Sequence, residues 1–433
     1  MKRAFLFFIL TVLSLTLLCA CNQIENGDSS YEVEGNIRYY IKDDGTYLAV
    51  ISSSSELTSF YIPDKRNEAP ISEVWIEGNV TCLPKSAFAD SVSLESLTVG
   101  ELTTNIEAGA LSACQNLESL TIHSLNGSLG ELFSDNSTED VNASVPKSLK
   151  KVSLGKGITK IVSYAFRGCT SLTSISLPES VVSIGDGIFE GCENLEYSEH
   201  GGAYYIGNSS NPYLFLVKAR DKEITSCSVN AGTRFILDEA FSGCSLLEAI
   251  EMNDRISTVC NRAFADCTSL QAITMPNSME VIGAGVFENC ESLKYNKNSS
   301  GLYLGNDTNP YLMLAKAYPA DGFIHYLVDE NTKFILDGAF QNVEFTFNLI
   351  IPESVIYICS LAFENCTGRL SAIISIPEEV SVIKADAFKN CTRIDIWCEA
   401  VSKPDGWDEN WNSSECSVTW DGNDIKNPLS PFN

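Results

Sequence analysis

Histidine, carboxylate and cysteine side chains are the residues of this sequence that could do acid–base, metal or nucleophilic chemistry. The 433 residues include only three histidines, His123, His200 and His325, which nearly excludes histidine-based metal or proton-transfer sites. Acid pairs such as Glu378 with Glu379 fall in predicted turns, where solvated carboxylates are expected. The motifs of serine hydrolases, zinc proteases and phosphate-binding loops do not occur. We therefore expect no catalytic residues, no metal and no cofactor, although a pair of glycosidase carboxylates far apart in the chain stays open.

Sixteen cysteines are a high number for a chain of this length. No C-x-x-C pair occurs, which speaks against a zinc site. Eight cysteines stand three residues after a recurring Phe or Leu: Cys114, Cys169, Cys192, Cys244, Cys267, Cys290, Cys366 and Cys391. We expect these eight to be buried, unreacted thiols, although export to an oxidising compartment would permit disulfides. Cys398 and Cys416 lie off this pattern, and a disulfide between them is possible.

The excess of acidic over basic residues excludes some classes of binding partner. Fifty-six acids face twenty-nine bases, which gives a formal net charge of −27. Nucleic acids are bound by clustered lysines and arginines, so they are not expected as partners. For the same reason the protein surface itself should not adhere to an anionic bilayer.

The N-terminus predicts export. Lys2 and Arg3 precede an apolar run over residues 4–18, which is the layout of a secretory signal peptide. The following Leu18-Cys19-Ala20-Cys21 resembles a bacterial lipobox, and this resemblance implies a lipid on Cys21. Plain cleavage near Ala20 is the alternative. We therefore predict a lipoprotein signal peptide over residues 1–21 and, from its polar composition, a flexible tether over residues 22–30. Membrane contact would be through the lipid alone.

An internal repeat dominates the rest of the chain. A phenylalanine marks most units, commonly with a step of 23 residues, as from Phe241 to Phe264 to Phe287. Each unit opens with L-x-x-I-x-L, the pattern of a short strand with alternating burial. A second apolar stretch ending in A-F forms the return side. Because one unit cannot bury its apolar face alone, the units must stack.

This pattern resembles the bacterial BspA-like leucine-rich repeat surface lipoproteins, with 23-residue repeats of the Treponema type. The resemblance implies an α/β-type repeat solenoid, a right-handed leucine-rich-repeat coil with a parallel β-sheet on one face. It also implies an extracellular adhesive or binding module, and some members are associated with host matrix or plasma proteins. The ligand does not transfer with the fold.

The repeat sets the domain boundaries. We predict a leucine-rich repeat array over residues 68–393, a β cap over residues 31–67 and a C-terminal cap over residues 394–433. Hairpin insertions are expected near residues 197–220 and 295–319, because each holds a Gly-Asn…Asn-Pro turn between apolar runs. Four hairpin tyrosines are candidate ligand contacts, although packing is the preferred interpretation: Tyr205, Tyr213, Tyr303 and Tyr311.

The residues that flank the central Ile of each strand should face solvent and form the candidate binding face. Its members are Glu73, Trp75, Thr98, Thr121, Lys151, Ser174, Ser176, Ser226, Ser228, Thr274 and His325. Trp75 and His325 stand out in a row of Ser and Thr, because hot spots favour aromatic side chains. Solubility of a solvent-facing sheet is an equally weighted explanation of this row. We expect a lipid-anchored protein of the outer membrane that faces outward and binds a host or neighbouring-cell protein or glycan. The alternative is a structural or assembly component of the cell envelope without a soluble ligand.

Overall fold

A computed structural model describes residues 31–128, 146–319 and 326–420, which hold strands β1 to β32 and no helix. The chain forms two compact units with a boundary between Glu196 and Tyr197, and each is described by itself. Cys21, the predicted signal peptide, the predicted tether and His325 lie outside the described residues.

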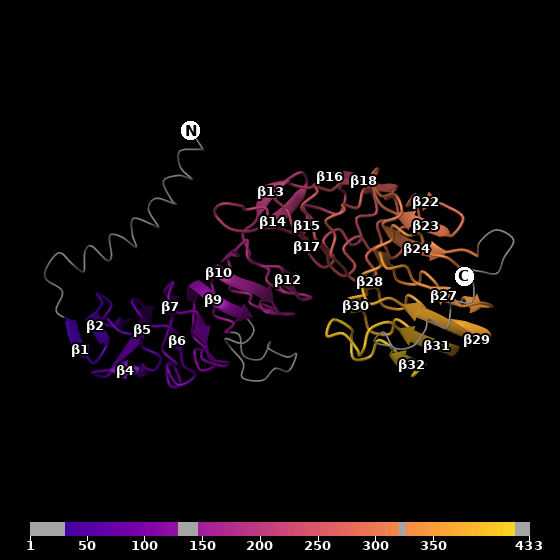
Figure 1. Ribbon diagram of the computed structural model, residues 1–433. Coiled ribbons are helices and arrows are strands. Elements are labelled where there is room, and N and C mark those ends of the chain that lie inside the picture. The colour runs from indigo at the N-terminus through magenta and orange to yellow at the C-terminus, as the bar shows by residue number, and fades with distance from the viewer. Residues whose placement is uncertain (1–30, 129–145, 320–325, 421–433) are drawn as a thin grey trace. The chain divides into compact units, whose positions relative to one another are not determined.

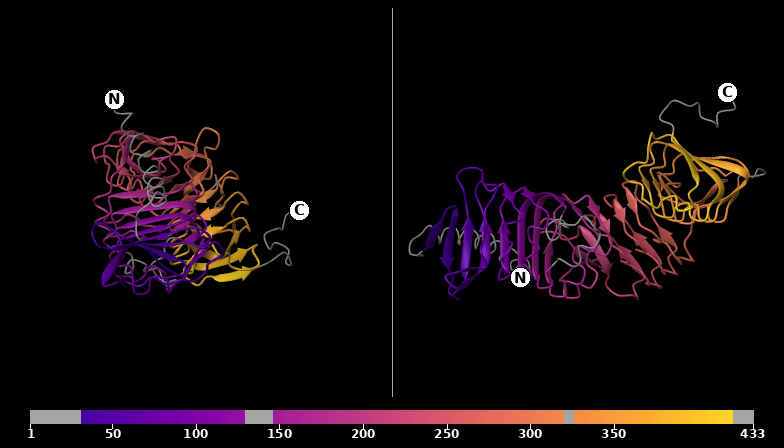
Figure 2. Two further views of the ribbon diagram at one scale, coloured as in Figure 1. Left: turned by 90° about the vertical axis from the view of Figure 1, so that its left-hand side faces the viewer. Right: turned by 90° about the horizontal axis from the view of Figure 1, so that it is seen from below.

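The first unit is built on one largely parallel sheet (Figure 1). Its strands are β1 (Tyr31–Glu34), β2 (Ile37–Ile41), β3 (Tyr47–Ile51), β4 (Lys65–Arg66), β5 (Ala69–Ile76), β6 (Cys82–Leu83), β7 (Ser96–Val99), β8 (Asn105–Ile106), β9 (Ser119–Ser128), β10 (Lys151–Ile161), β11 (Ser174–Ser176) and β12 (Ser183–Ile184). β1, β2 and β3 form an antiparallel meander, and β5, β7, β9, β10 and β11 then follow in parallel. Figure 2 shows the strands of successive coils lying side by side.

The second unit contains separate sheets on its two sides. Its first strands are β13 (Ser198–His200), β14 (Ala203–Ile206), β15 (Phe215–Ala219), β16 (Ser226–Ser228), β17 (Phe235–Ile236), β18 (Ala249–Glu251), β19 (Thr258–Val259), β20 (Ala272–Ile273) and β21 (Val281–Ile282). Then come β22 (Asn296–Lys297), β23 (Gly301–Leu304), β24 (Met313–Ala317), β25 (Phe334–Ile335), β26 (Glu344–Phe345), β27 (Leu349–Ile350), β28 (Tyr357–Ile358), β29 (Thr367–Ile376), β30 (Val382–Ile383), β31 (Thr392–Cys398) and β32 (Ser417–Trp420). The predicted repeat solenoid is confirmed, with turns rather than helices on its return side.

Alternating burial sets which side of each strand faces the core. In β7 the side chains of Leu97 and Val99 are fully buried, whereas Ser96 and Thr98 are half-buried on the outer face. The parallel register places Leu97 beside Val74 and Leu120 of the neighbouring strands. The outward direction of the residues that flank the central apolar position is therefore confirmed for these coils.

The return side consists of turns stacked through their phenylalanines. Phe264 lies 5.3 Å from Phe241 and 5.9 Å from Phe287 between ring centroids, with rings nearly parallel in both pairs. Residues two before and two after the phenylalanine have positive φ, as at Arg262 (φ 54) and Asp266 (φ 60). Gly and Asn occupy many of these positions because they adopt the left-handed region at low cost. The predicted phenylalanine column is confirmed.

The cysteine column lies directly beside this one. Ladder thiols donate to the carbonyl oxygen of a phenylalanine one unit earlier, as from Cys267 Sγ to Phe241 O at 3.1 Å and from Cys290 Sγ to Phe264 O at 3.1 Å. All eight ladder cysteines are buried and free, which confirms the expected unreacted thiols. Burial raises the pKa of Cys267 to about 12, so its thiolate is scarce and its reactivity low.

An aromatic ring closes the phenylalanine column at an end of each unit. In the first unit Phe60 meets Phe88 edge-on at 6.4 Å. In the second, Trp411 meets Phe388 edge-on at 5.6 Å. The indole of Trp407 packs on Trp411 and donates to Val380 O at 2.8 Å. These tryptophans are buried, so they serve packing rather than an exposed sugar platform.

Candidate functional site

Of the two hot-spot candidates of the predicted binding face, Trp75 on β5 is the one that the structure describes, and its neighbours hold it in place. Its indole N–H donates to Glu73 Oε1 at 2.9 Å. Lys42 Nζ lies 3.3 Å from Glu73 Oε2, and the indole packs against the cluster of Tyr40, Leu48 and Val50. A half-buried ring fixed in this way loses little rotamer freedom when a partner covers it.

Two rows of hydroxyl groups continue from this corner across the parallel strands. The register places Trp75 beside Thr98, Thr98 beside Thr121, and Thr121 beside Ser153. The adjacent row contains, in order, Glu73, Ser96, Ser119, Lys151 and Ser174. Neighbouring strands lie about 4.8 Å apart, so the face offers closely spaced hydrogen-bonding groups beside one aromatic ring. Ser176 extends the Trp75 row by pairing with Ser153.

The predicted face of the second unit is represented in the described residues by three small polar side chains. Ser226, Ser228 and Thr274 are all exposed, and Ser228 Oγ donates to Glu251 Oε2 on the next strand at 3.3 Å. Of the described residues of the predicted face, the aromatic one therefore lies in the first unit.

Two of the four hairpin tyrosines cannot contact a ligand, which corrects the candidate role of Tyr205 and Tyr303. Tyr205 and Tyr303 are fully buried. Each meets the ring of a half-buried partner edge-on, Tyr213 at 5.6 Å and Tyr311 at 5.2 Å. The reason is that the last strand of each hairpin joins the return-side sheet, with β15 beside β17 and β24 beside β25. The inner face of the hairpin thereby covers the core.

The suggested disulfide between Cys398 and Cys416 is also corrected, because both are free thiols. The parallel register pairs Cys398 with Trp420 and Asp395 with Ser417. Cys416 therefore lies about four residues, or roughly 13 Å, along the strand from the position opposite Cys398, well beyond disulfide reach. Its thiol interacts with that of Cys391 instead.

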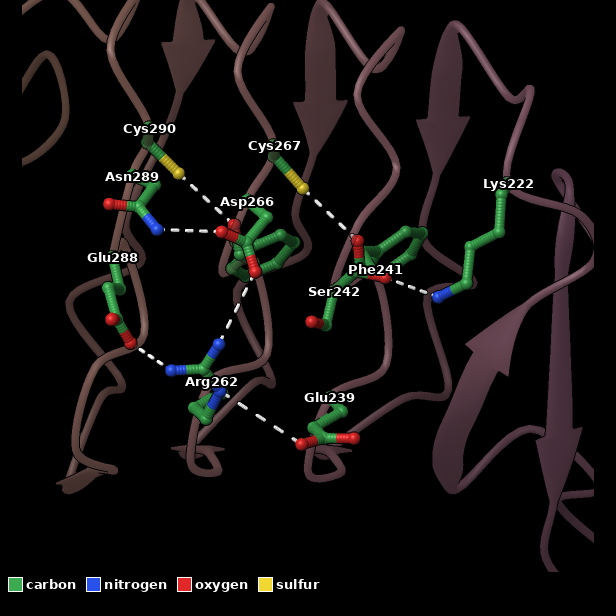
Figure 3. Close-up of polar contacts among 11 residues, drawn as sticks. Lys222, Glu239, Phe241, Ser242, Arg262, Asp266, Cys267, Glu288, Asn289 and Cys290 are labelled. Carbon is green, nitrogen blue, oxygen red and sulfur yellow. Dashed lines mark hydrogen bonds and ion pairs between the residues drawn. The ribbon is translucent and has the colours of Figure 1, made fainter.

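A charged cluster on the return side was not foreseen from the sequence. Figure 3 shows the guanidinium of Arg262 among three carboxylates. It forms ion pairs with Asp266 at 3.3 Å, with Glu239 at 4.0 Å and with Glu288. These acids come from its own turn and the two neighbouring turns, so one cation links three coils. The signal was present in the sequence as charges at equivalent repeat positions.

A pocket of about 530 Å³ opens next to this cluster. The turn around Phe287 and the turn around Phe340 form its two sides, and Tyr295 and Ala315 contribute to its wall. Sequence reasoning missed the pocket because its two sides are 53 residues apart along the chain, on either side of the second hairpin insertion.

Comparison with protein families identifies the repeats. The model of the "BspA type Leucine rich repeat region" matches six copies, over residues 63–147, 143–210, 219–307 and 323–398. Among functionally curated proteins, none matches. No helix long and apolar enough to cross a membrane occurs within residues 31–128, 146–319 and 326–420.

Solved structures of bacterial repeat proteins also align with the chain. A leucine-rich cell surface protein of Faecalibacterium prausnitzii is 17% identical, with 87% of this chain and 96% of that chain covered and a TM-score of 0.23. A leucine-rich repeat protein of Eubacterium ventriosum is 20% identical, with 88% and 99% covered and a TM-score of 0.30. The pneumococcal vaccine antigen PcpA is 14% identical, with 92% and 100% covered and a TM-score of 0.28. With scores this low, the assignment rests on the repeats themselves.

Proposed function

Because the chain belongs to the BspA-type leucine-rich repeat family, whose members are generally non-catalytic binding modules, we propose that it is an exported lipoprotein that binds a protein or glycan outside the cell. The observation that supports this most is the Trp75 corner with its adjoining hydroxyl rows. An immobilised aromatic ring next to regularly spaced donors and acceptors suits recognition of an extended surface. Solenoids use such repeated faces to bind partners.

Binding should depend on Trp75. The soluble chain from residue 22 onward is tested for binding to immobilised extracellular-matrix proteins and glycans. For any ligand found, Trp75→Ala should weaken binding about tenfold or more, because a buried aromatic hot spot contributes at least about 1.4 kcal/mol. Ser245→Ala, at an exposed turn serine outside the candidate binding face, is the matched control and should bind like the wild type. Undiminished binding by Trp75→Ala would place the ligand elsewhere.

The anchor should depend on Cys21. In cells that express the full chain, the wild type should partition into the detergent phase, since one or more acyl chains dominate its membrane affinity. Cys21→Ser removes the acceptor thiol and should move the protein to the aqueous phase. Cys19→Ser is the control and should leave the partition unchanged. Detergent-phase recovery of the Cys21→Ser protein would refute lipidation at this residue.

A further inference from the structure

The second hairpin insertion interrupts every column of the return side at one place. The rings of Phe264 and Phe287 are 23 residues apart in sequence, but the next phenylalanine of the column, Phe340, follows after 53 residues. β21 is the last strand of its sheet, and a new sheet begins with the hairpin strands β22, β23 and β24. The turn around Phe287 therefore has no regular successor stacked upon it.

The missing successor leaves the hydrogen-bonding groups of this turn open. In the preceding turn the N–H groups of Arg262, Phe264 and Asp266 donate to carbonyl oxygens of the next coil at 2.9, 3.0 and 2.8 Å. Of the equivalent groups around Phe287, the Gly285 N–H donates to a side chain, Asp337 Oδ2, at 2.6 Å. The N–H groups of Phe287 and Asn289 donate to no atom of the residues that the structure describes.

The pocket lies where the next turn would stack on Phe287 in an uninterrupted array. Its volume of about 530 Å³ lies in the range of small-ligand sites. Apolar groups of Phe287, Tyr295, Ala315 and Leu336 line it. The ring of Phe287 is half-buried, whereas Phe264, which is covered on both sides, is fully buried. One ring face of the phenylalanine column is therefore available to a ligand.

The charges around the pocket favour a cation. Asp337 and Glu288 line it, and Asp337 Oδ1 is buried without a hydrogen-bond partner in the described part of the chain. Among the described residues of the lining, Arg262 is the only basic one, and its guanidinium is already paired with Glu288, Asp266 and Glu239 (Figure 3). Three carboxylates thus already pair with the one guanidinium, and Asp337 is a further acid whose buried Oδ1 lacks a donor.

We propose that this pocket binds a ligand that carries a primary ammonium group on an aromatic or branched aliphatic body. The ammonium pairs with the Asp337 carboxylate and supplies the donor that this group lacks. The apolar body covers Phe287, where the next ring of the column lies in an uninterrupted stack. A free amine and the N-terminus of a peptide share this chemistry. The site shares no residue with the Trp75 face, and neither proposal depends on the other.

The test uses three probes on the soluble chain from residue 22 onward: 2-phenylethylamine, the dipeptide amide Phe-Leu-NH2, and the N-acetylated form of that dipeptide amide. Binding is measured at neutral pH by calorimetry and ligand-observed NMR. At least one of the two cationic probes should bind, and the acetylated peptide should bind about tenfold more weakly or worse, because it lacks the charge. Binding of the amine alone identifies a free amine as the natural class, and binding of the dipeptide alone identifies a peptide N-terminus.

Variants of the lining residues test whether the probes bind in this pocket. Asp337→Asn keeps the shape of the side chain and should lower the affinity for the cationic probe about tenfold or more. Ala315→Leu should block the pocket, and far-ultraviolet circular dichroism checks that it folds. Asp254→Asn, which removes an exposed carboxylate outside the pocket lining, is the control and should bind the probe like the wild type. Absence of binding by both cations at millimolar concentration, equal binding of the acetylated peptide, or full affinity in Asp337→Asn would each overturn the proposal.

Discussion

Replacing Phe264 by alanine is expected to lower the free energy of unfolding by about 3–5 kcal/mol, from lost transfer energy plus the cavity left behind. Phe264 is fully buried and lies between two nearly parallel rings at 5.3 and 5.9 Å. Because Phe241 and Phe287 each pack on it, its loss uncovers a face of both. Denaturant unfolding monitored by circular dichroism measures the change.

The destabilisation by Phe264→Ala should also be local, because each coil contacts mainly its neighbours. Hydrogen exchange should accelerate first in the turns around Phe241, Phe264 and Phe287 and later near Trp411. Ser226→Ala on the exposed face of the same unit is the control and should change stability by less than about 0.5 kcal/mol. Similar small effects for both variants would contradict the inward direction of the phenylalanine column.

The second large effect concerns the pH dependence of stability through Asp337. Burial raises the pKa of this carboxyl from 3.8 to about 6, and Glu288 adds to the rise, whereas the hydrogen bond from Gly285 N–H opposes it. The neighbouring Cys359 thiol is neutral, since burial raises its pKa as well. The folded chain therefore keeps a proton on Asp337 in a pH range where the unfolded chain has lost it.

The sign follows from this difference in bound protons. Between about pH 4 and pH 6 the folded state holds the extra proton, so the contribution of Asp337 to stability falls as the pH rises and stays low above pH 6. The full loss is about 3 kcal/mol, from about two pH units at 1.36 kcal/mol each. Asp337→Asn cannot ionise, so at neutral pH we expect it to be more stable than the wild type by up to this amount.

Chemical denaturation of both proteins at a series of pH values checks this expectation. The difference between Asp337→Asn and the wild type should shrink towards pH 4, where Asp337 is protonated in both states of the wild type. Asp254→Asn, at an exposed acid of the same unit, is the matched control and should show no such trend. A wild type that gains stability relative to Asp337→Asn as the pH rises would contradict the raised pKa.

The repeat determined the positions of the core residues without any tertiary information. Phe241, Phe264 and Phe287 recur every 23 residues, and residues at equal places in stacked coils must lie above one another. The same argument located the cysteine column and the outward direction of Thr98 and Thr121. A nearest-neighbour architecture makes these features predictable, because each coil repeats the environment of the previous one.

Only the tertiary structure decided what happens where the period is broken. Tyr204 and Tyr205 are adjacent, and a shift of one residue exchanges the inner and outer side chains of a strand. The pairing of β15 with β17 selects Tyr205 for the core. The partner of Cys416 likewise depends on the register of β32 against β31. The pocket at Asp337 exists because a hairpin replaces a coil and brings together turns 53 residues apart, a distance that no local pattern in the sequence specifies.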